Sequence, residues 1–362
     1  MSDGNPRGSF SGLRAPLRDR SSSVSARGAT QSELFFDMTL IFSLQNMFLL
    51  PLTSTGIGQL ALFYALLWNG WVGIAFFNTR FDMDDLVSRA FAVADMVAVV
   101  GMSLAIPTAN VTAFVSFYMS IRVLLVVKYI RVWLSSSGSY IVSGFIIGFS
   151  LGVACWAVAI CVPTDKAALL GVLIGCALLC DYGTPFALLR HMLPVHSFHF
   201  PERLAGMVVL MFCGTLFNFV QSLPSPLASL AEGGSGEAVQ TSCDWLDFLS
   251  CATFGIIISF GHILLFMRVP GPDVLAFGRS FWTRLRVYLY IYLNMPLGLT
   301  AMVMSTSAGA IAKAIPGEPN TVHLDMFAVS CGLVHMLFVP LHLLAVTCNV
   351  RRAVRASCRL AQ

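Results

Sequence analysis

Charged and polar side chains inside apolar stretches are the residues of this sequence that are most able to do chemistry. Asp95 and Arg122 lie in the middle of long apolar runs, and Asp181 and Asn294 lie in two later ones. A charge buried in hydrocarbon requires an opposite charge or a water-filled space, and such residues often line the paths of ions and solutes. We therefore expect Asp95, Arg122, Asp181 and Asn294 to form ion pairs or to line a path.

Residue counting places Asp95 and Arg122 at the same depth in two successive helices. Asp95 follows Asp84 by 11 residues, and Arg122 precedes Arg131 by nine, where Asp84 and Arg131 are the expected inner ends. At 1.5 Å per residue, both side chains lie about 13–16 Å deep. We therefore predict an Asp95–Arg122 ion pair. The pair could be structural, because pairing is the usual way to tolerate buried charge, or it could serve transport.

Two prolines fall close to these polar residues. Pro185 follows Asp181 and should kink its helix, while Asn294 directly precedes Met295-Pro296. A proline frees backbone groups, and freed groups at mid-depth are typical of the discontinuous helices of transporters. Many prolines in membrane helices only kink them, so this signal does not decide the function.

A second group of charged residues lies at the ends of apolar runs that we expect to face the cytoplasm. Glu33 and Asp37 are four residues apart and share a helix face. Asp84 or Asp85 could cap the helix that follows. The histidines nearby lack the spacing of metal ligands, so we expect no metal and no cofactor. The group consists of Glu33, Asp37, Arg80, Asp82, Asp85, Glu202 and Arg203.

The elements that position these residues must be membrane-spanning helices. Of the 362 residues, 57% are hydrophobic and 11% are charged, whereas soluble domains carry roughly 25% charged residues. Lipid requires every backbone polar group to be paired within the chain, and the apolar runs are long without strand-like alternation. We predict an all-α, polytopic bundle of about ten transmembrane helices. The expected spans are 34–52, 57–77, 86–106, 111–133, 140–162, 167–189, 203–223, 245–267, 285–308 and 323–348.

The positions of the basic residues orient these spans. With the N-terminus inside, all but three of the 22 Lys and Arg residues fall on the cytoplasmic side or its flanks. The exceptions are Lys166, Lys313 and the buried Arg122. This distribution follows the positive-inside rule, so we expect both termini to be cytoplasmic. Which cellular membrane holds the protein stays open.

The chain divides into a membrane domain and two basic tails. Residues 1–32 are rich in Ser and Arg and contain no apolar signal segment, so we expect a disordered cytoplasmic tail. A transit peptide and a kinase site at Arg18-Asp19-Arg20-Ser21-Ser22-Ser23 stay open for this tail. The membrane domain covers 33–350, and 351–362 forms the second tail. Ten spans could form two inverted five-helix halves, as in many transporters.

One glycine stripe predicts a close contact between helices. Gly144, Gly148 and Gly152 recur at intervals of four residues within one apolar run. Small residues at this spacing let two membrane helices approach closely. The stripe is a packing signal and carries no chemistry.

Several motifs together resemble those of a known family. The first is the run Glu33-Leu34-Phe35-Phe36-Asp37-Met38-Thr39-Leu40-Ile41-Phe42. It resembles the low temperature requirement protein A (LtrA) family, whose members open with E-L-F-F-D-L-V-F-V-F. The order and spacing of the motifs hold over residues 33 to about 310. Further matches are Asn78-Thr79-Arg80-Phe81-Asp82-Met83-Asp84-Asp85 (N-R-F-D-x-D-D in the family), Arg122, Asp181 with Pro185, and His199-Phe200-Pro201-Glu202-Arg203 (H-x-x-E-R).

The second half departs from the family pattern. Where the family usually has a G-E pair, this chain has Phe212-Cys213-Gly214-Thr215. The Y-F-D motif of the family is replaced by Ser259-Phe260-Gly261-His262, and its H-x-P by Asn294-Met295-Pro296. If the missing acids carry the family's activity, this member is altered or inactive. The resemblance implies the fold and leaves the molecular activity open.

Three functions fit the sequence. The leading hypothesis is a transporter or channel for an unidentified small solute or ion, with Asp95, Arg122, Asp181 and Asn294 near its path. One alternative is a membrane enzyme or lipid-handling protein that uses the second charged group, and the other is a non-catalytic membrane stress-adaptation component. Nucleotide-binding motifs are absent from the sequence, which argues against an ATP-driven pump. The expected partner is the lipid bilayer; we expect no nucleic acid, and the oligomeric state stays open.

Overall fold

The regular elements formed by the described residues are α-helices. The computed structural model describes residues 30–81, 85–135, 139–163, 166–189, 191, 199–222, 281–313, 325–337, 339–341 and 343. Three sequence expectations lie outside these residues: the structure of most of the first tail and all of the second, the span at 245–267, and the place of Asp82.

Seven of the described helices are long and apolar enough to cross a membrane, which confirms the prediction of an all-α, multi-pass membrane protein. Each coincides with a predicted span. The shorter α1 (Gln31–Met47) and an apolar helix at Asp325–Leu341 coincide with two more. The number ten, the two halves and the orientation of the termini stay predictions. The seven helices are α2 (Ser54–Arg80), α3 (Leu86–Ala105), α4 (Val111–Ser135), α5 (Tyr140–Cys161), α6 (Ala167–Ala187), α7 (His199–Ser222) and α11 (Phe281–Lys313).

The start of α1 is set by a capping box. The Thr30 hydroxyl accepts a hydrogen bond from the backbone N–H of Glu33 at 3.3 Å, and the Glu33 carboxylate accepts one from the backbone N–H of Thr30 at 2.9 Å. This reciprocal arrangement satisfies two N–H groups that the first turn leaves free. The helix therefore begins at Gln31, three residues before the predicted span, and Gln31 and Ser32 are helical rather than part of the tail.

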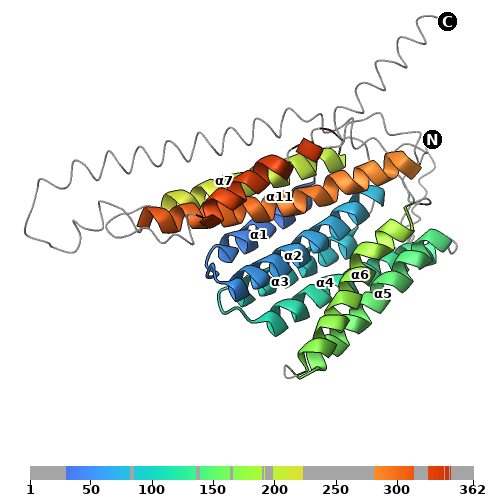
Figure 1. Cartoon of the computed structure of the whole chain (residues 1–362). Coiled ribbons are helices and arrows are strands. Elements are labelled where there is room, and N and C mark those ends of the chain that lie inside the picture. Colours follow the sequence, from blue (N-terminus) through green and yellow to red (C-terminus); the bar gives the residue numbers. More distant parts are fainter. Residues whose placement is uncertain are drawn as a thin grey trace, which may run out of the picture.

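Helix α2 forms the interior of the bundle (Figure 1). Inside the protein, 78% of its most apolar window is buried, against 17% for α6. It contacts α1, α4, α7 and α11, while α3 packs on α1 and α4, and the α5–α6 hairpin packs on α4. Helices α7 and α11 lie side by side along α1 and α2, away from the α5–α6 hairpin (Figure 1).

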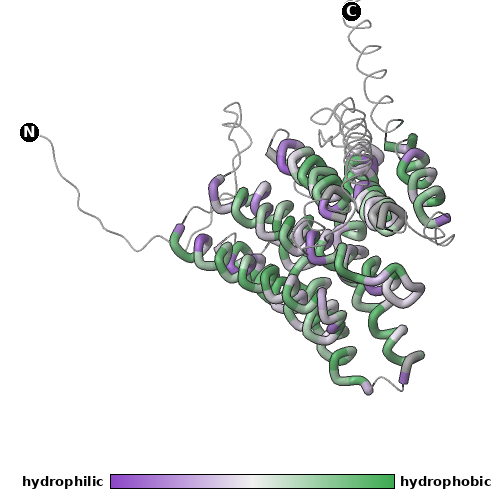
Figure 2. The backbone as a smooth tube through the Cα atoms, turned by 90° about the vertical axis from the view of Figure 1, so that its left-hand side faces the viewer, coloured by the Kyte–Doolittle hydropathy of each residue, from purple (hydrophilic) through white to green (hydrophobic). Residues whose placement is uncertain are grey.

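The outer faces of the bundle are apolar. Hydrophobic residues make up most of the length of the helices (Figure 2), and Leu104 and Leu179 are each 72% exposed. A water-soluble protein rarely exposes contiguous apolar surface of this kind, whereas lipid requires it. The helices therefore present the surface of a membrane protein, and polar groups are concentrated between them.

The glycine stripe of α5 forms the predicted close contact, and its partner is α6. A Cβ atom at Gly148 would lie 2.1 Å from Oγ1 of Thr184, so only glycine fits there. On the same face, Gly152 contacts Asp181: a Cβ atom added at Gly152 would lie 3.1 Å from Oδ1 of Asp181. The stripe thus brings α6, and with it the Asp181 carboxylate, close to α5.

Candidate functional site

The candidate site is a buried pocket beside α2. Asn69, Gly73, Phe76 and Arg80 follow each other at intervals of three or four residues, so they share one face of this helix. That face is turned towards residues of α4, α5, α6 and α11, which complete the lining. Five helices therefore meet at one space inside the bundle, which charged, polar and aromatic residues line.

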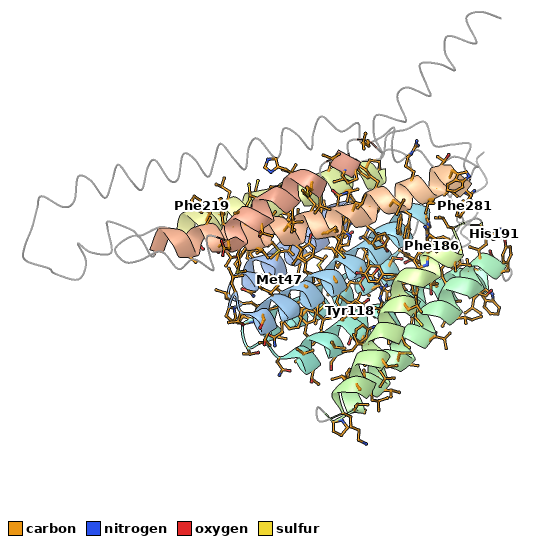
Figure 3. The ribbon with its side chains drawn as sticks, viewed as in Figure 1. Met47, Tyr118, Phe186, His191, Phe219 and Phe281 are labelled. Atoms are coloured by element: carbon orange, nitrogen blue, oxygen red, sulfur yellow. The ribbon has the colours of Figure 1, made fainter. Side chains whose placement is uncertain are left out.

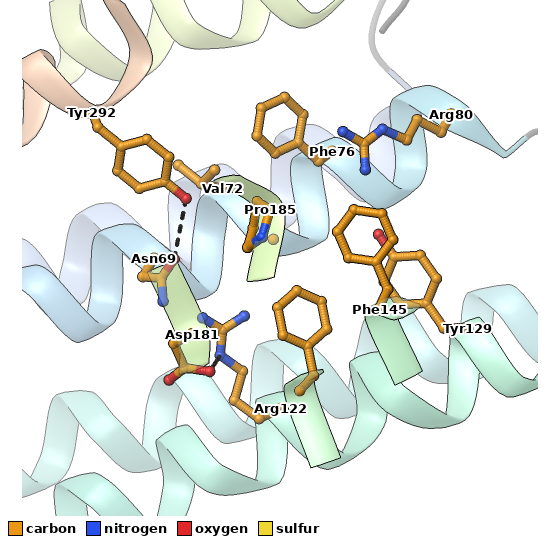
Figure 4. Close-up of a pocket in the computed structure, with 12 residues that line it drawn as sticks. Asn69, Val72, Phe76, Arg80, Arg122, Tyr129, Phe145, Asp181, Pro185 and Tyr292 are labelled. Atoms are coloured by element: carbon orange, nitrogen blue, oxygen red, sulfur yellow. Dashed lines mark hydrogen bonds and ion pairs between the residues drawn. The ribbon is translucent and has the colours of Figure 1, made fainter. Parts of the chain in front are cut away.

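The pocket is narrow. The gaps between its lining atoms add up to about 260 Å³, but most of these gaps are too narrow for a molecule. The remaining room admits about one water molecule. Figure 4 shows Arg80 and Arg122 extending from α2 and α4 towards this space. The lining residues are Asn69, Val72, Gly73, Phe76, Arg80, Arg122, Tyr129, Phe145, Phe149, Asp181, Pro185 and Tyr292.

Asp181 of α6 is the buried acid of the pocket. It is not exposed at all, and its Oδ1 lies 3.2 Å from Nε of Arg122. Its Oδ2 accepts hydrogen bonds from the Tyr118 hydroxyl at 2.6 Å and from the indole N–H of Trp156 at 2.9 Å. Figure 3 shows Tyr118 in the interior of the bundle. Charge and hydrogen bonds together keep this carboxylate in one orientation.

Arg122 of α4 is held by aromatic and polar contacts. Its Nε–H donates to the Tyr118 hydroxyl at 2.7 Å, so its contact with Asp181 is electrostatic rather than a hydrogen bond. The guanidinium lies 5.1 Å from the ring centres of Tyr118 and Phe149. Gly73 leaves room for it, since a Cβ there would lie 3.0 Å from Nη1. Nη2 of Arg122 has no hydrogen-bond partner among the described residues.

The Tyr118 hydroxyl connects the pocket's polar residues. Besides donating to Asp181 and accepting from Arg122, it accepts from the Asn69 side-chain amide at 3.1 Å. The Tyr292 hydroxyl of α11 donates to the Asn69 carbonyl oxygen at 3.4 Å. One hydroxyl thus uses its donor and both acceptor positions, and the network joins α2, α4, α6 and α11.

Arg80 is the second cation of the pocket. Only 5% of it is exposed, and its guanidinium lies 4.8 Å from the ring centre of Phe76 and 5.4 Å from that of Phe145. Among the described residues, its Nε and Nη2 have no hydrogen-bond partner and no carboxylate forms an ion pair with it. Its place in the last turn of α2 favours a positive charge, because helix C-termini carry partial negative charge.

The charges that line the pocket do not balance. Arg80 and Arg122 are positive, and Asp181 is the one carboxylate among the described lining residues. The pocket therefore carries an excess of one positive charge inside the protein. A buried charge of this kind is costly unless a counter-ion or water compensates it.

The predicted Asp95–Arg122 ion pair is wrong. Asp95 pairs with Lys128 of α4, and Arg122 pairs with Asp181. Asp95 and Arg122 were paired on their depth alone, but pairing also depends on the direction in which each side chain points. At 100° per residue, Arg122 lies about 140° around α4 from Phe117, which contacts α3, whereas Lys128 lies only about 20° from Phe117. Lys128 faces α3, and Arg122 faces the pocket.

The second charged group is divided between three places. Arg203 of α7 joins the two acids of α1: its Nη2 and Nε donate to Asp37 at 2.6 and 3.1 Å, and its Nη1 donates to Glu33 at 3.4 Å. The indole N–H of Trp71 donates to the same Asp37 carboxylate at 2.8 Å. All three charged residues are buried. Arg80 lies away from them in the pocket.

Two further members of that group, Asp85 and Glu202, lie at helix ends. Asp85 caps α3 by accepting from the backbone N–H of Ser88 at 2.8 Å, and it forms an ion pair with Arg131 of α4. Glu202 is exposed in the first turn of α7. Partial burial raises the pKa of Asp85, but hydrogen bonds from Arg131 and Ser88 outweigh it and lower the pKa to about 2.

Asn294 is buried but does not line the pocket. Its amide donates to the backbone carbonyl of Tyr290 at 2.7 Å, and its Oδ1 has no partner among the described residues. Two residues later, Pro296 cannot donate to the carbonyl of Tyr292. Within the described residues, Asn294 therefore makes no hydrogen bond with the other residues that we expected near a path. Asp95 also lies outside the lining of the pocket.

Several residues of the site were not singled out from the sequence. Tyr118 precedes Arg122 by one helical turn, so the spacing could have placed it on the same face. Trp156, Tyr129 and Phe145 gave no signal, because aromatic residues are abundant throughout the apolar runs. Among the described residues, no three His, Cys, Asp or Glu side chains are grouped closely enough to hold a metal ion.

Comparison with family models gives a match over almost the whole chain. A family model, described as that of the bacterial low temperature requirement A protein (LtrA), matches residues 28–361. This range extends beyond the resemblance traced from the motifs, which ended at about residue 310. No curated protein and no solved structure matches the chain.

Proposed function

The chain belongs to the bacterial low temperature requirement A (LtrA) family, and we propose that this multi-pass membrane protein is a transporter or channel for a small solute. The path runs through the pocket beside α2. Of the four residues expected near a path, Arg122 and Asp181 are the two that line this pocket.

The observation that carries the proposal is Arg80. It is buried inside a bundle of membrane helices, it lines the pocket, and no described acid pairs with it. Ionisable groups that face the interior of such a bundle mark ion and solute pathways more often than packing sites, because an uncompensated charge destabilises the fold. A purely structural role would favour the pairing of each buried charge with an opposite charge, as between Asp95 and Lys128.

The alternative of a lipid headgroup site or an enzyme receives less support. It would use the second charged group, but within that group Arg203 is already engaged by Asp37 and Glu33 and is only 1% exposed. A headgroup would have to displace these carboxylates. The arrangement favours a structural tie between the two helices.

Two double variants test the proposal, and each neutralises one buried ion pair of α4. Arg122→Gln with Asp181→Asn neutralises the pocket pair, and Asp95→Asn with Lys128→Gln neutralises a buried pair outside the pocket. Replacing both members of a buried pair by neutral groups costs much less stability than removing one. Purified protein is reconstituted into liposomes, and uptake of inorganic ions and of small metabolites is followed.

We expect the pocket variant to lose solute flux and the control variant to keep it. Absence of flux for every ion and metabolite tested with the wild-type protein would overturn the proposal. Equal loss in both variants would also overturn it, because flux would then depend on general packing rather than on the pocket.

A further inference from the structure

We infer that the pocket binds one small monovalent anion between Arg80 and Arg122. The inference deepens the proposed function by naming the class of solute, and it rests on that function for the role of the site. Binding itself can be measured without transport.

The charge of the lining favours an anion. Arg80 and Arg122 face one carboxylate, Asp181, whose Oδ2 already accepts two hydrogen bonds. One negative charge in the pocket would bring the lining residues to neutrality. A cation would add to the excess positive charge, and a neutral solute would leave it uncompensated.

The unused donors also favour an anion. Nε and Nη2 of Arg80 and Nη2 of Arg122 are buried nitrogens without a hydrogen-bond partner in the described part of the chain. Guanidinium N–H groups donate in the plane of the group and cannot accept. Both residues line the same pocket, and Figure 4 shows both guanidinium groups directed into it.

The aromatic rings around Arg80 do not satisfy these donors. Phe76 and Phe145 lie against the guanidinium and stabilise its charge through their ring faces. An arene offers no lone pair to an in-plane N–H, so the donors stay free for a ligand. The same rings shield the group from water, which strengthens any charge–charge contact made there.

The room in the pocket limits the size of the anion. Space for about one water molecule suits chloride, bromide or nitrate with little widening of the pocket. Phosphate and organic dianions are larger and carry more charge than the single excess positive charge of the lining. We therefore expect them not to bind.

Anion binding is tested on the full-length protein in detergent by thermal unfolding. Sodium nitrate or sodium bromide is titrated against sodium gluconate at constant ionic strength, with inorganic phosphate as the anion expected to fail. Choline salts replace the sodium salts in a parallel series, so that cation effects are seen separately. We expect a saturable rise in melting temperature with nitrate and bromide.

Arg80→Gln should raise the half-saturating concentration about tenfold or more, since hydrogen bonds to a charged group contribute on that scale. Asp95→Asn with Lys128→Gln should leave it unchanged. As a second pair, Gly73→Ala places a methyl group against Arg122 and should weaken binding, whereas Gly171→Ala, with no atom within 4 Å, should not. If Arg80→Gln does not fold, the comparison of Gly73→Ala with Gly171→Ala tests anion binding in its place.

No saturable anion effect in the wild-type protein would overturn the inference. So would an unchanged half-saturating concentration in Arg80→Gln, or in Gly73→Ala where Arg80→Gln does not fold. Flux of a cation or a neutral metabolite without anion binding would overturn this inference and leave the proposed function standing. Anion binding without any flux would leave the inference standing and remove the transport role.

Discussion

Arg203 of α7 and Asp37 of α1 are joined by two hydrogen bonds although 166 residues separate them in the chain. Nη2 meets Oδ1 at 2.6 Å, and Nε meets Oδ2 at 3.1 Å. Two parallel hydrogen bonds between a guanidinium and a carboxylate fix orientation as well as distance. The pair therefore sets how α7 lies on α1.

We expect Arg203→Gln to lower the free energy of unfolding by about 3–5 kcal/mol, because it leaves the buried Asp37 carboxylate without its counter-charge. The measurement is unfolding of the purified protein in mixed micelles. Arg203→Gln combined with Asp37→Asn should recover part of the loss. If the single variant is as stable as the wild type, the pair does not hold α1 and α7 together.

The α5–α6 contact provides a second prediction. Gly148→Ala should lower the free energy of unfolding by about 1–3 kcal/mol, since the new methyl group would overlap the Thr184 side chain. Adding Thr184→Ala should restore much of this, because it removes the overlapping atoms. Gly171→Ala, whose surroundings are open, serves as the control and should cost nothing. Equal effects of Gly148→Ala and Gly171→Ala would contradict a tight α5–α6 contact.

The membrane spans could be predicted from the sequence because the signal for each is local. Each apolar run carries its own length and hydropathy, and α4 and α5 match their predicted ranges to within two residues at each end. The depth estimate for Asp95 and Arg122 was also local, since it needed only the rise per residue. The start of α1 was missed because the Thr30–Glu33 capping box is polar and precedes the apolar run.

The partners of the buried charges could not be predicted in the same way. Pairing depends on which helices are neighbours and on which face each side chain lies, and neither is encoded within a single span. Arg122 was assigned to Asp95 because their helices are adjacent in the chain, but its partner Asp181 lies two helices further on. The family motifs marked Asp37 and Arg203 as separate features and did not indicate that they touch.

The Asp85–Arg131 contact predicts a dependence of stability on pH. Asp85 lies just before the α3 span, and its pKa is lowered from 3.8 to about 2, so the folded state holds its charged form. Its contribution to stability is complete above about pH 4 and is lost as the pH falls from about 4 through 2. We expect the difference in melting temperature between wild type and Asp85→Asn to be constant above about pH 5 and to shrink below pH 4. A difference that stays constant down to pH 2 would contradict the lowered pKa.

Tyr118→Phe tests the network that holds the pocket together. The ring, and with it the packing against Trp156, is kept, but Asp181 loses a donor and Arg122 and Asn69 lose an acceptor. We expect a loss of about 1–3 kcal/mol in the free energy of unfolding, because buried polar groups are left without a partner. The loss is measured by unfolding in mixed micelles and compared with Tyr290→Phe. The Tyr290 side chain is also buried, but within the described residues its hydroxyl forms no hydrogen bond and it lies outside the pocket lining. Equal stability of the two variants would mean that the Tyr118 hydroxyl does not fix the positions of Asp181 and Arg122.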